Sequence, residues 1–215
     1  MSMELWQFLV IFTVGVVAGV INTLAGGGSL ITLPVLIFLG LPATVANGTN
    51  RLAITVQSVL AVAGFKRKGV SDFKSSLLMS LPALIGAIIG AQLAVDVSDI
   101  LFKRILAVVM ILVLGLILWN PIRMRQGTVQ YDGGMTCLSR RRRTASMLIF
   151  FFIGVYGGFI QAGIGFLIIA VLTTIRGLNL VETNSHKVFI VGINALFALI
   201  VFIFNSKICW PIGLA

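Results

Sequence analysis

The sequence predicts an all-α, polytopic transmembrane helix bundle, and its composition and segment lengths are the observations that predict it. Of the 215 residues, 59% are hydrophobic and only 10% are charged. A water-soluble protein carries charge on about a quarter of its residues, so most of the outer surface of this chain does not suit water. A helix crosses a bilayer with about 20 apolar residues, and apolar segments of that order recur along the whole chain.

The apolar segments follow one another with short polar connections. They span residues 5–25, 30–41, 52–65, 75–95, 105–119, 147–162, 166–175 and 188–204. The segments 30–41 and 166–175 are too short to cross a bilayer alone. Each follows a glycine cluster, Gly26-Gly27-Gly28 in the first case and Gly163-Ile164-Gly165 in the second. We therefore predict a glycine-broken helical hairpin at each place.

These two places belong to an internal repeat, in which residues 15–36 align with 154–172. The alignment pairs Asn22 with Gln161, Gly26 with Gly163, Gly28 with Gly165 and, further on, Asn47 with Asn184. The basic clusters at 66–74 and at 123, 125 and 140–143 are typical of cytoplasmic loops. With both clusters inside, the span at 52–65 runs inward and its counterpart at 188–204 runs outward, so the two copies are inverted. Inverted repeats with broken helices recur in secondary transporters, which hold substrate at the repeat interface.

The charge pattern also sets the expected surroundings. The formal net charge is +10, but the basic residues form short runs between apolar segments, which favours membrane topology and lipid headgroups over nucleic acid. We expect a multi-pass protein of the cell's inner (cytoplasmic) membrane: a first repeat with its following spans at 1–119, a basic cytoplasmic loop at 120–146 and a second repeat at 147–215. The two cysteines have no metal-ligand spacing, and we predict no cofactor. The sequence leaves open whether the protein is a homodimer.

The same residues carry a family resemblance. GVINTLAGGGSLITLPVLIFLGLPATVANGTNRLAITVQSV resembles the first repeat of the TauE/SafE family of membrane permeases, which is associated with sulfite and organosulfonate export. GVYGGFIQAGIGFLIIAVL, followed by ETNSHKVFIVGINALFALIVF, is similar to the second repeat. The resemblance implies a permease for a small anion, such as sulfite or an organosulfonate, that works by alternating access. It also implies roughly one or two further spans after KICWPIGLA, so the chain reads as C-terminally short relative to the family.

An anion carrier needs a place to hold negative charge inside the bilayer, and helix N-termini supply one. We expect Ser29 to cap a short helix that begins at Leu30. Arg51 and Lys187 are the predicted counter-charges, although each lies at a segment edge and snorkelling to the headgroups is the alternative. The other predicted substrate contacts are amides, hydroxyls, an imidazole and the glycine breaks: Asn22, Gly26, Gly27, Gly28, Asn47, Thr49, Asn50, Gln161, Gly163, Gly165, Asn184 and His186.

Two rivals to a transporter remain open. The spans contain no metal cluster, buried acid pair or nucleophile motif, so we predict no catalytic residue, and a membrane-embedded enzyme is the weaker rival. A non-transporting membrane scaffold or subunit is the other. Substrate-dependent flux into liposomes separates a carrier from both.

Overall fold

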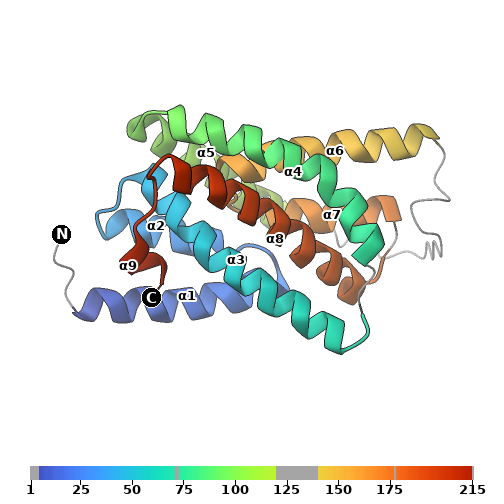
Figure 1. Ribbon diagram of the computed structural model, residues 1–215, viewed down its shortest axis with the longest axis horizontal. Helices are drawn as coiled ribbons and strands as arrows, with labels where there is room; N and C mark the ends of the chain where they lie inside the picture. Colours follow the sequence, from blue (N-terminus) through green and yellow to red (C-terminus); the bar gives the residue numbers. More distant parts are fainter. Residues whose placement is uncertain (1–4, 71–72, 120–139, 177, 215) are drawn as a thin grey trace.

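The computed structural model describes residues 5–70, 73–119, 140–176 and 178–214, and within these ranges all regular structure is helical (Figure 1). The predicted all-α class is confirmed there. The helices are α1 (Leu5–Leu24), α2 (Ser29–Phe38), α3 (Ala43–Arg67), α4 (Phe73–Asp96), α5 (Asp99–Trp119), α6 (Arg140–Phe159), α7 (Ile164–Arg176), α8 (Leu180–Phe204) and α9 (Trp210–Gly213).

The helices α3 and α8 begin well before the apolar segments at 52–65 and 188–204. The polar patches that precede those segments are therefore helical. They form helix because their polar side chains are buried and find partners inside the protein. Asn179 caps α8 by accepting a hydrogen bond from the amide of Glu182. The helix α6 begins at Arg140, and residues 120–139 of the predicted basic loop lie outside the described residues.

The chain breaks between α1 and α2 and again between α6 and α7. Gly26 has a φ of +90° and Gly163 a φ of +72°, a left-handed conformation that glycine adopts without the steric cost of a side chain. In Figure 1, α2 returns toward the end of the bundle where α1 begins, and α7 returns toward the opposite end, where α6 begins. We call α1 with α2 the first helix pair and α6 with α7 the second helix pair.

The two breaks touch each other backbone to backbone. A Cβ atom added to Gly26 would lie 2.4 Å from Cα of Gly165, and one added to Gly165 would lie 2.3 Å from Cα of Gly26. Both distances are far below the 3.5–4.0 Å or so at which carbon atoms pack. Glycine is therefore required on both sides of this contact.

Small residues also join α4 to α6. A Cβ atom added to Gly86 would lie 2.2 Å from the carbonyl oxygen of Phe151, and one added to Gly154 would lie 2.1 Å from that of Ala83. Close backbone approach at small residues is how helices pack in membranes. It positions the second helix pair against α4, with Ile168, Ile190 and neighbouring apolar side chains forming the core beside it.

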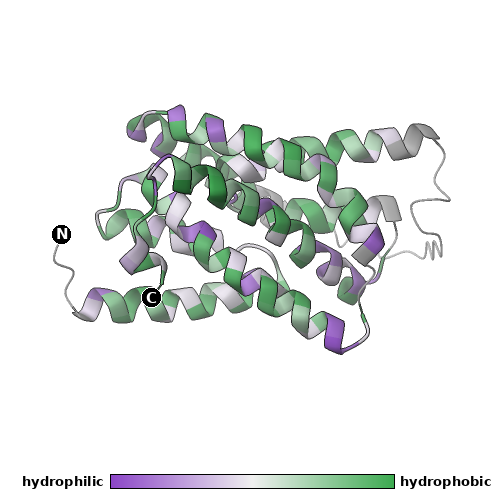
Figure 2. Ribbon diagram, in the orientation of Figure 1, coloured by the Kyte–Doolittle hydropathy of each residue, from purple (hydrophilic) through white to green (hydrophobic). Residues whose placement is uncertain are grey.

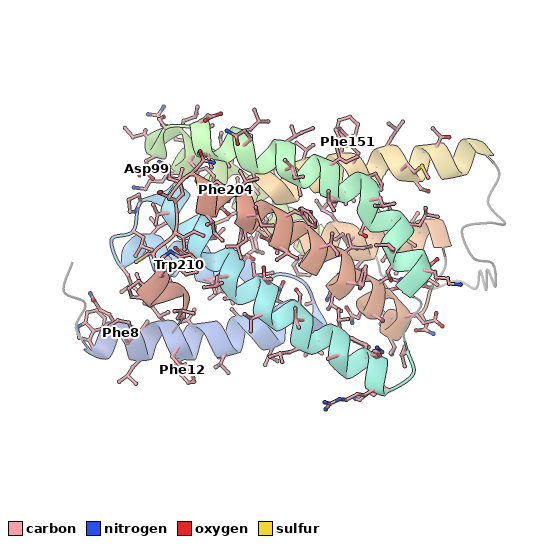
Figure 3. The ribbon with its side chains drawn as sticks, viewed as in Figure 1. Phe8, Phe12, Asp99, Phe151, Phe204 and Trp210 are labelled. Atoms are coloured by element: carbon pink, nitrogen blue, oxygen red, sulfur yellow. The ribbon has the colours of Figure 1, made fainter. Side chains whose placement is uncertain are left out.

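The outer surface is apolar along the helices. Figure 2 shows hydrophobic residues along most of their length, and Figure 3 shows Phe12 pointing away from the other helices. Phe12 and Phe204 are 57% and 84% exposed. Among the residues that the structure describes, three helical stretches are long and apolar enough to cross a membrane, Trp6–Leu24, Lys74–Asp96 and Leu180–Phe204. Such a surface suits lipid.

Asp99, the first residue of α5, fixes the N-terminal end of α3 and lies outside those three stretches. Its carboxylate accepts a hydrogen bond from the amide of Ala43 and lies 2.7 Å from Nζ of Lys103. Burial raises the pKa of Asp99, but Lys103 and the amides of Ala43 and Thr44 outweigh it, so the pKa lies below its ordinary value. A carboxylate is favourable at a helix N-terminus, and this one anchors the helix that carries Arg51.

Candidate functional site

Arg51 lies inside α3 with 0% of its surface exposed, at the C-terminal end of α6. Its Nη1 donates to Oε1 of Gln161 over 3.0 Å, and its Nη2 donates to the carbonyl oxygen of Gly158. The guanidinium carbon lies 4.9 Å from the centroid of the Phe202 ring, within the range of a cation–π contact. The snorkelling alternative is therefore wrong for Arg51.

Gln161 reaches Arg51 from the break between α6 and α7. Its φ is +64°, a conformation that non-glycine residues seldom adopt and that costs about 1–3 kcal/mol where it persists. The side chain is 2% exposed. A costly backbone held in this position is typical of a functional site.

Asn47 neighbours both Asn50 and Arg51 on α3, because residues three and four apart lie side by side on a helix. Asn47 donates through Nδ2 to the carbonyl oxygen of Phe159 over 2.8 Å. Asn50 accepts through Oδ1 from the hydroxyl of Thr32 on α2 over 2.7 Å. The turn of α3 from Asn47 to Arg51 thus contacts both helix pairs at once.

Lys187 lies on α8, is 1% exposed and contacts the C-terminal end of α1. Its Nζ donates to the carbonyl oxygens of Asn22 and Thr23 over 3.1 and 2.8 Å, and to Oδ1 of Asn184 over 2.7 Å. An ammonium group has three hydrogens to donate, so all are in use, and snorkelling is wrong here too. Each cation thus meets the carbonyl end of a broken helix, where the helix dipole is negative.

In the described part of the chain, four of the six unpaired buried polar atoms belong to Arg51, Gln161, Asn47 and Asn50, and the other two belong to Asn194. Within the described ranges they are Asn47 Oδ1, Asn50 Nδ2, Arg51 Nε, Gln161 Nε2 and both amide atoms of Asn194. Buried polar groups are normally hydrogen-bonded, and each exception calls for an explanation, such as a ligand. The Arg51 cluster, which we define as Asn47, Asn50, Arg51 and Gln161, is where a polar ligand would find such groups.

The charge of this cluster is not balanced by a carboxylate in the part of the chain that the structure describes. The ion pair found there is Lys103 with Asp99, at the end of the bundle. No three His, Cys, Asp or Glu side chains come together there in a way that would hold a metal ion. The groups at hand are a cation and amides, which are groups able to hold an anion by charge and hydrogen bonds.

Some residues that the sequence predicts as substrate contacts have partners outside the Arg51 cluster. Thr49 accepts from the amide of Cys209 over 2.9 Å, which ties the segment before α9 to α3. Nδ1 of His186 lies 2.7 Å from the hydroxyl of Ser76 on α4. Gly27 packs under the ring of Phe166, where an added Cβ atom would lie 2.6 Å away.

The predicted cap at Ser29 is wrong. The helix α2 begins at Ser29 itself, Gly28 occupies the N-cap position, and no side chain caps the helix. The carbonyls of Gly27 and Gly28 already accept from the amides of the first turn. Because these amides already have acceptors in the tightly closed first turn, the serine hydroxyl is not required to accept from them.

The sequence reasoning missed several contact residues. Thr32, Gly158 and Phe202 contact residues of the Arg51 cluster. Each contacts α3 from another helix, so no local pattern marks it.

The chain matches one family model, described as sulfite exporter TauE/SafE, over residues 11–215. It is similar to a probable membrane transporter protein of Sinorhizobium sp., with 28% identity over 100% of this chain and 78% of the relative. It is similar at 28% identity to a probable membrane transporter protein of Haemophilus influenzae, over 95% of this chain and 77% of the relative. The probable membrane transporter protein YfcA of Escherichia coli is 27% identical over 95% of this chain and 73% of its own length. No solved structure matches the chain.

Proposed function

This chain belongs to the sulfite exporter TauE/SafE family of integral membrane proteins, and on that premise we propose that it carries a small anion across the inner (cytoplasmic) membrane. The family description names sulfite, and the sequence resemblance adds organosulfonates to the proposed substrate class. The relatives are named as probable membrane transporter proteins. Their names support a transport function but name no substrate. The substrate is therefore inferred from the chemistry of the site.

The observation that carries the proposal is the guanidinium of Arg51, buried without a carboxylate partner among the described side chains. A buried charge is costly unless something compensates it. Two uncharged acceptors, Gln161 and Gly158, compensate it only in part. An anion would complete the compensation, and intramembrane ionisable residues mark substrate pathways by default.

The two cations have different roles in this proposal. Lys187 uses all its hydrogens on protein acceptors, so it holds the end of α1 in place. Nε of Arg51, Nε2 of Gln161 and Nδ2 of Asn50 all remain unpaired. The anion therefore binds at the Arg51 cluster, with the N-terminal ends of α2 and α7 adding their positive dipole ends nearby.

Alternating access follows from the arrangement of the two helix pairs. They enter the bundle from opposite ends and meet at Gly26 and Gly165 (Figure 1), which supports an inverted repeat and several membrane passes. The exposed Lys66, Arg67 and Lys68 lie at the end of the bundle where α6 begins, which supports a cytoplasmic position for that end. Rocking of one pair against the other would expose the Arg51 cluster to each side in turn.

The experiment that tests the proposal is sulfite flux in liposomes that contain the purified full chain. Arg51→Ala removes the charge and should lower flux at least about tenfold, because one lost charged hydrogen bond costs about 1.5–3 kcal/mol. Arg104→Ala, at an exposed position on α5, is the matched control and should leave flux unchanged. Equal flux in both variants would remove Arg51 from the site.

The wild-type protein decides between the classes of function. No flux of any anion, from protein that remains folded, would favour the scaffold. Chemical turnover of an anion without vectorial movement would favour the enzyme. Flux of sulfite or an organosulfonate that saturates with concentration supports the carrier.

A further inference from the structure

We infer that the Arg51 cluster selects an oxyanion that keeps one O–H group, such as hydrogensulfite, over an anion of equal charge that has none. This inference rests on the proposed function and narrows its substrate class. It follows from which atoms of the cluster stay unpaired once the protein's own hydrogen bonds are made.

Two of the unpaired atoms must be hydrogen-bond donors, because the protein's own hydrogen bonds and side-chain chemistry leave no other assignment. Oε1 of Gln161 accepts from Arg51, and because arginine only donates, the amide cannot be turned the other way. Its Nε2 therefore remains as an unpaired donor. Nε of Arg51 is the second unpaired donor. Asn50 adds Nδ2, since its Oδ1 faces the hydroxyl of Thr32.

One unpaired atom is an acceptor, and its identity is fixed in the same way. Nδ2 of Asn47 donates to the carbonyl oxygen of Phe159 over 2.8 Å. A carbonyl oxygen only accepts, so the amide orientation is set and Oδ1 of Asn47 is the atom left over. Asn47 and Arg51 lie one helical turn apart on α3 and bind the adjacent carbonyls of Phe159 and Gly158. The acceptor thus lies in the same cluster as the donors.

A ligand that satisfies this set needs acceptor oxygens for the donors and one hydrogen for Oδ1 of Asn47. A fully deprotonated oxyanion offers oxygens only, so it would leave Oδ1 unpaired and facing negative charge. An oxyanion with one O–H group can donate to Oδ1 while its other oxygens accept. A site built to hydrogen-bond a ligand hydroxyl discriminates strongly against the analogue without it, because the buried partner is then unpaired.

The test compares hydrogensulfite with methanesulfinate, in which a methyl group replaces the hydroxyl at the same charge. The readout is the concentration of each anion that half-maximally raises the thermal stability of the purified full chain, since a ligand of the folded state stabilises it. We expect hydrogensulfite to bind at least about tenfold more tightly. Raising the pH through the second ionisation of sulfurous acid should weaken binding, although charge alone would strengthen it.

Asn47→Ala removes the acceptor and should bring the ratio of the two affinities close to one. Asn194→Ala removes another buried amide with unpaired atoms, on α8, and should leave the ratio as in the wild type. Because the ratio compares two ligands on one variant, a general loss of stability cancels from it.

Three results would overturn the inference. If methanesulfinate binds as tightly as hydrogensulfite, the cluster still holds an anion and the proposed function stands, but the selection for an O–H group is wrong. A ratio unchanged by Asn47→Ala assigns the selection to another residue. If neither these two anions nor sulfate binds to the folded protein, the proposed function fails together with the inference.

Discussion

The contact between the two breaks can be tested without any assumption about function, by the substitution Gly165→Ala. The new Cβ atom would lie 2.3 Å from Cα, 2.7 Å from the carbonyl oxygen and 2.9 Å from the carbonyl carbon of Gly26. Carbon atoms pack at about 3.5 Å or more, so the two backbones must separate by roughly 1 Å. All three atoms belong to the backbone, so no side-chain rotation can relieve the clash.

Overpacking of this kind costs about 1–3 kcal/mol. For a chain of this size, one kcal/mol corresponds to a shift of about 2–4 °C in Tm, so Gly165→Ala should lower Tm by roughly 2–12 °C. Thermal unfolding of the purified protein measures this shift. Flux should fall as well, because the separated breaks move Gln161 away from Arg51.

Gly64→Ala is the matched control, because nothing lies within 4 Å of a Cβ atom at that position. Replacing a helical glycine by alanine there should be neutral or stabilising by up to about 1 kcal/mol. If Gly165→Ala unfolds at the same temperature as Gly64→Ala, the two helix pairs do not meet at the glycine breaks, and the reasoning that places them there is refuted.

Three further predictions concern individual side chains. Lys187→Met should lower the free energy of unfolding by about 1–3 kcal/mol for each acceptor that stays unpaired. Unfolding by denaturant measures this change. Lys66→Met, at an exposed position, should show no comparable loss. Gln161→Gly should have a free energy of unfolding about 1 kcal/mol higher than that of Gln161→Ala, because the φ of +64° suits glycine. Both variants should lose flux. An alanine variant as stable as the glycine variant would argue against the left-handed backbone. Asp99 has a pKa below its ordinary value when folded, so its stabilising contribution is present at neutral pH and is lost as the pH falls below about 3.9 toward the folded value. Asp99→Asn should flatten that acid limb in Tm measured against pH, and an unchanged limb would count against the capping contact.

The predicted cap at Ser29 and the observed break illustrate the limit of local patterns. Glycine clusters identify where helices end, because glycine tolerates the left-handed turn at Gly26 and Gly163. They do not say which residue starts the next helix, since that depends on how the first turn closes. Here the carbonyls of Gly27 and Gly28 close it, and the serine hydroxyl has no part.

The site residues also divide into those that the sequence identifies and those that only the structure identifies. Arg51 and Lys187 stand out in an apolar sequence because charge there is costly, and the alignment of Asn22 with Gln161 marks the two breaks as related. The partners of these residues belong to other elements, as with Gly158 and Phe202 for Arg51 and Thr23 for Lys187. Hydrogen bonds between residues far apart in the chain leave no periodic signal.

The sequence by itself determined that the protein lies in a membrane, that it is helical and where its helices break. Each of these follows from composition and local conformational preference. Only the tertiary structure decided that the breaks meet at Gly26 and Gly165, that Lys187 is saturated with acceptors and that Arg51 retains an unpaired donor. Those facts depend on distances between elements far apart in the chain, and packing alone sets such distances.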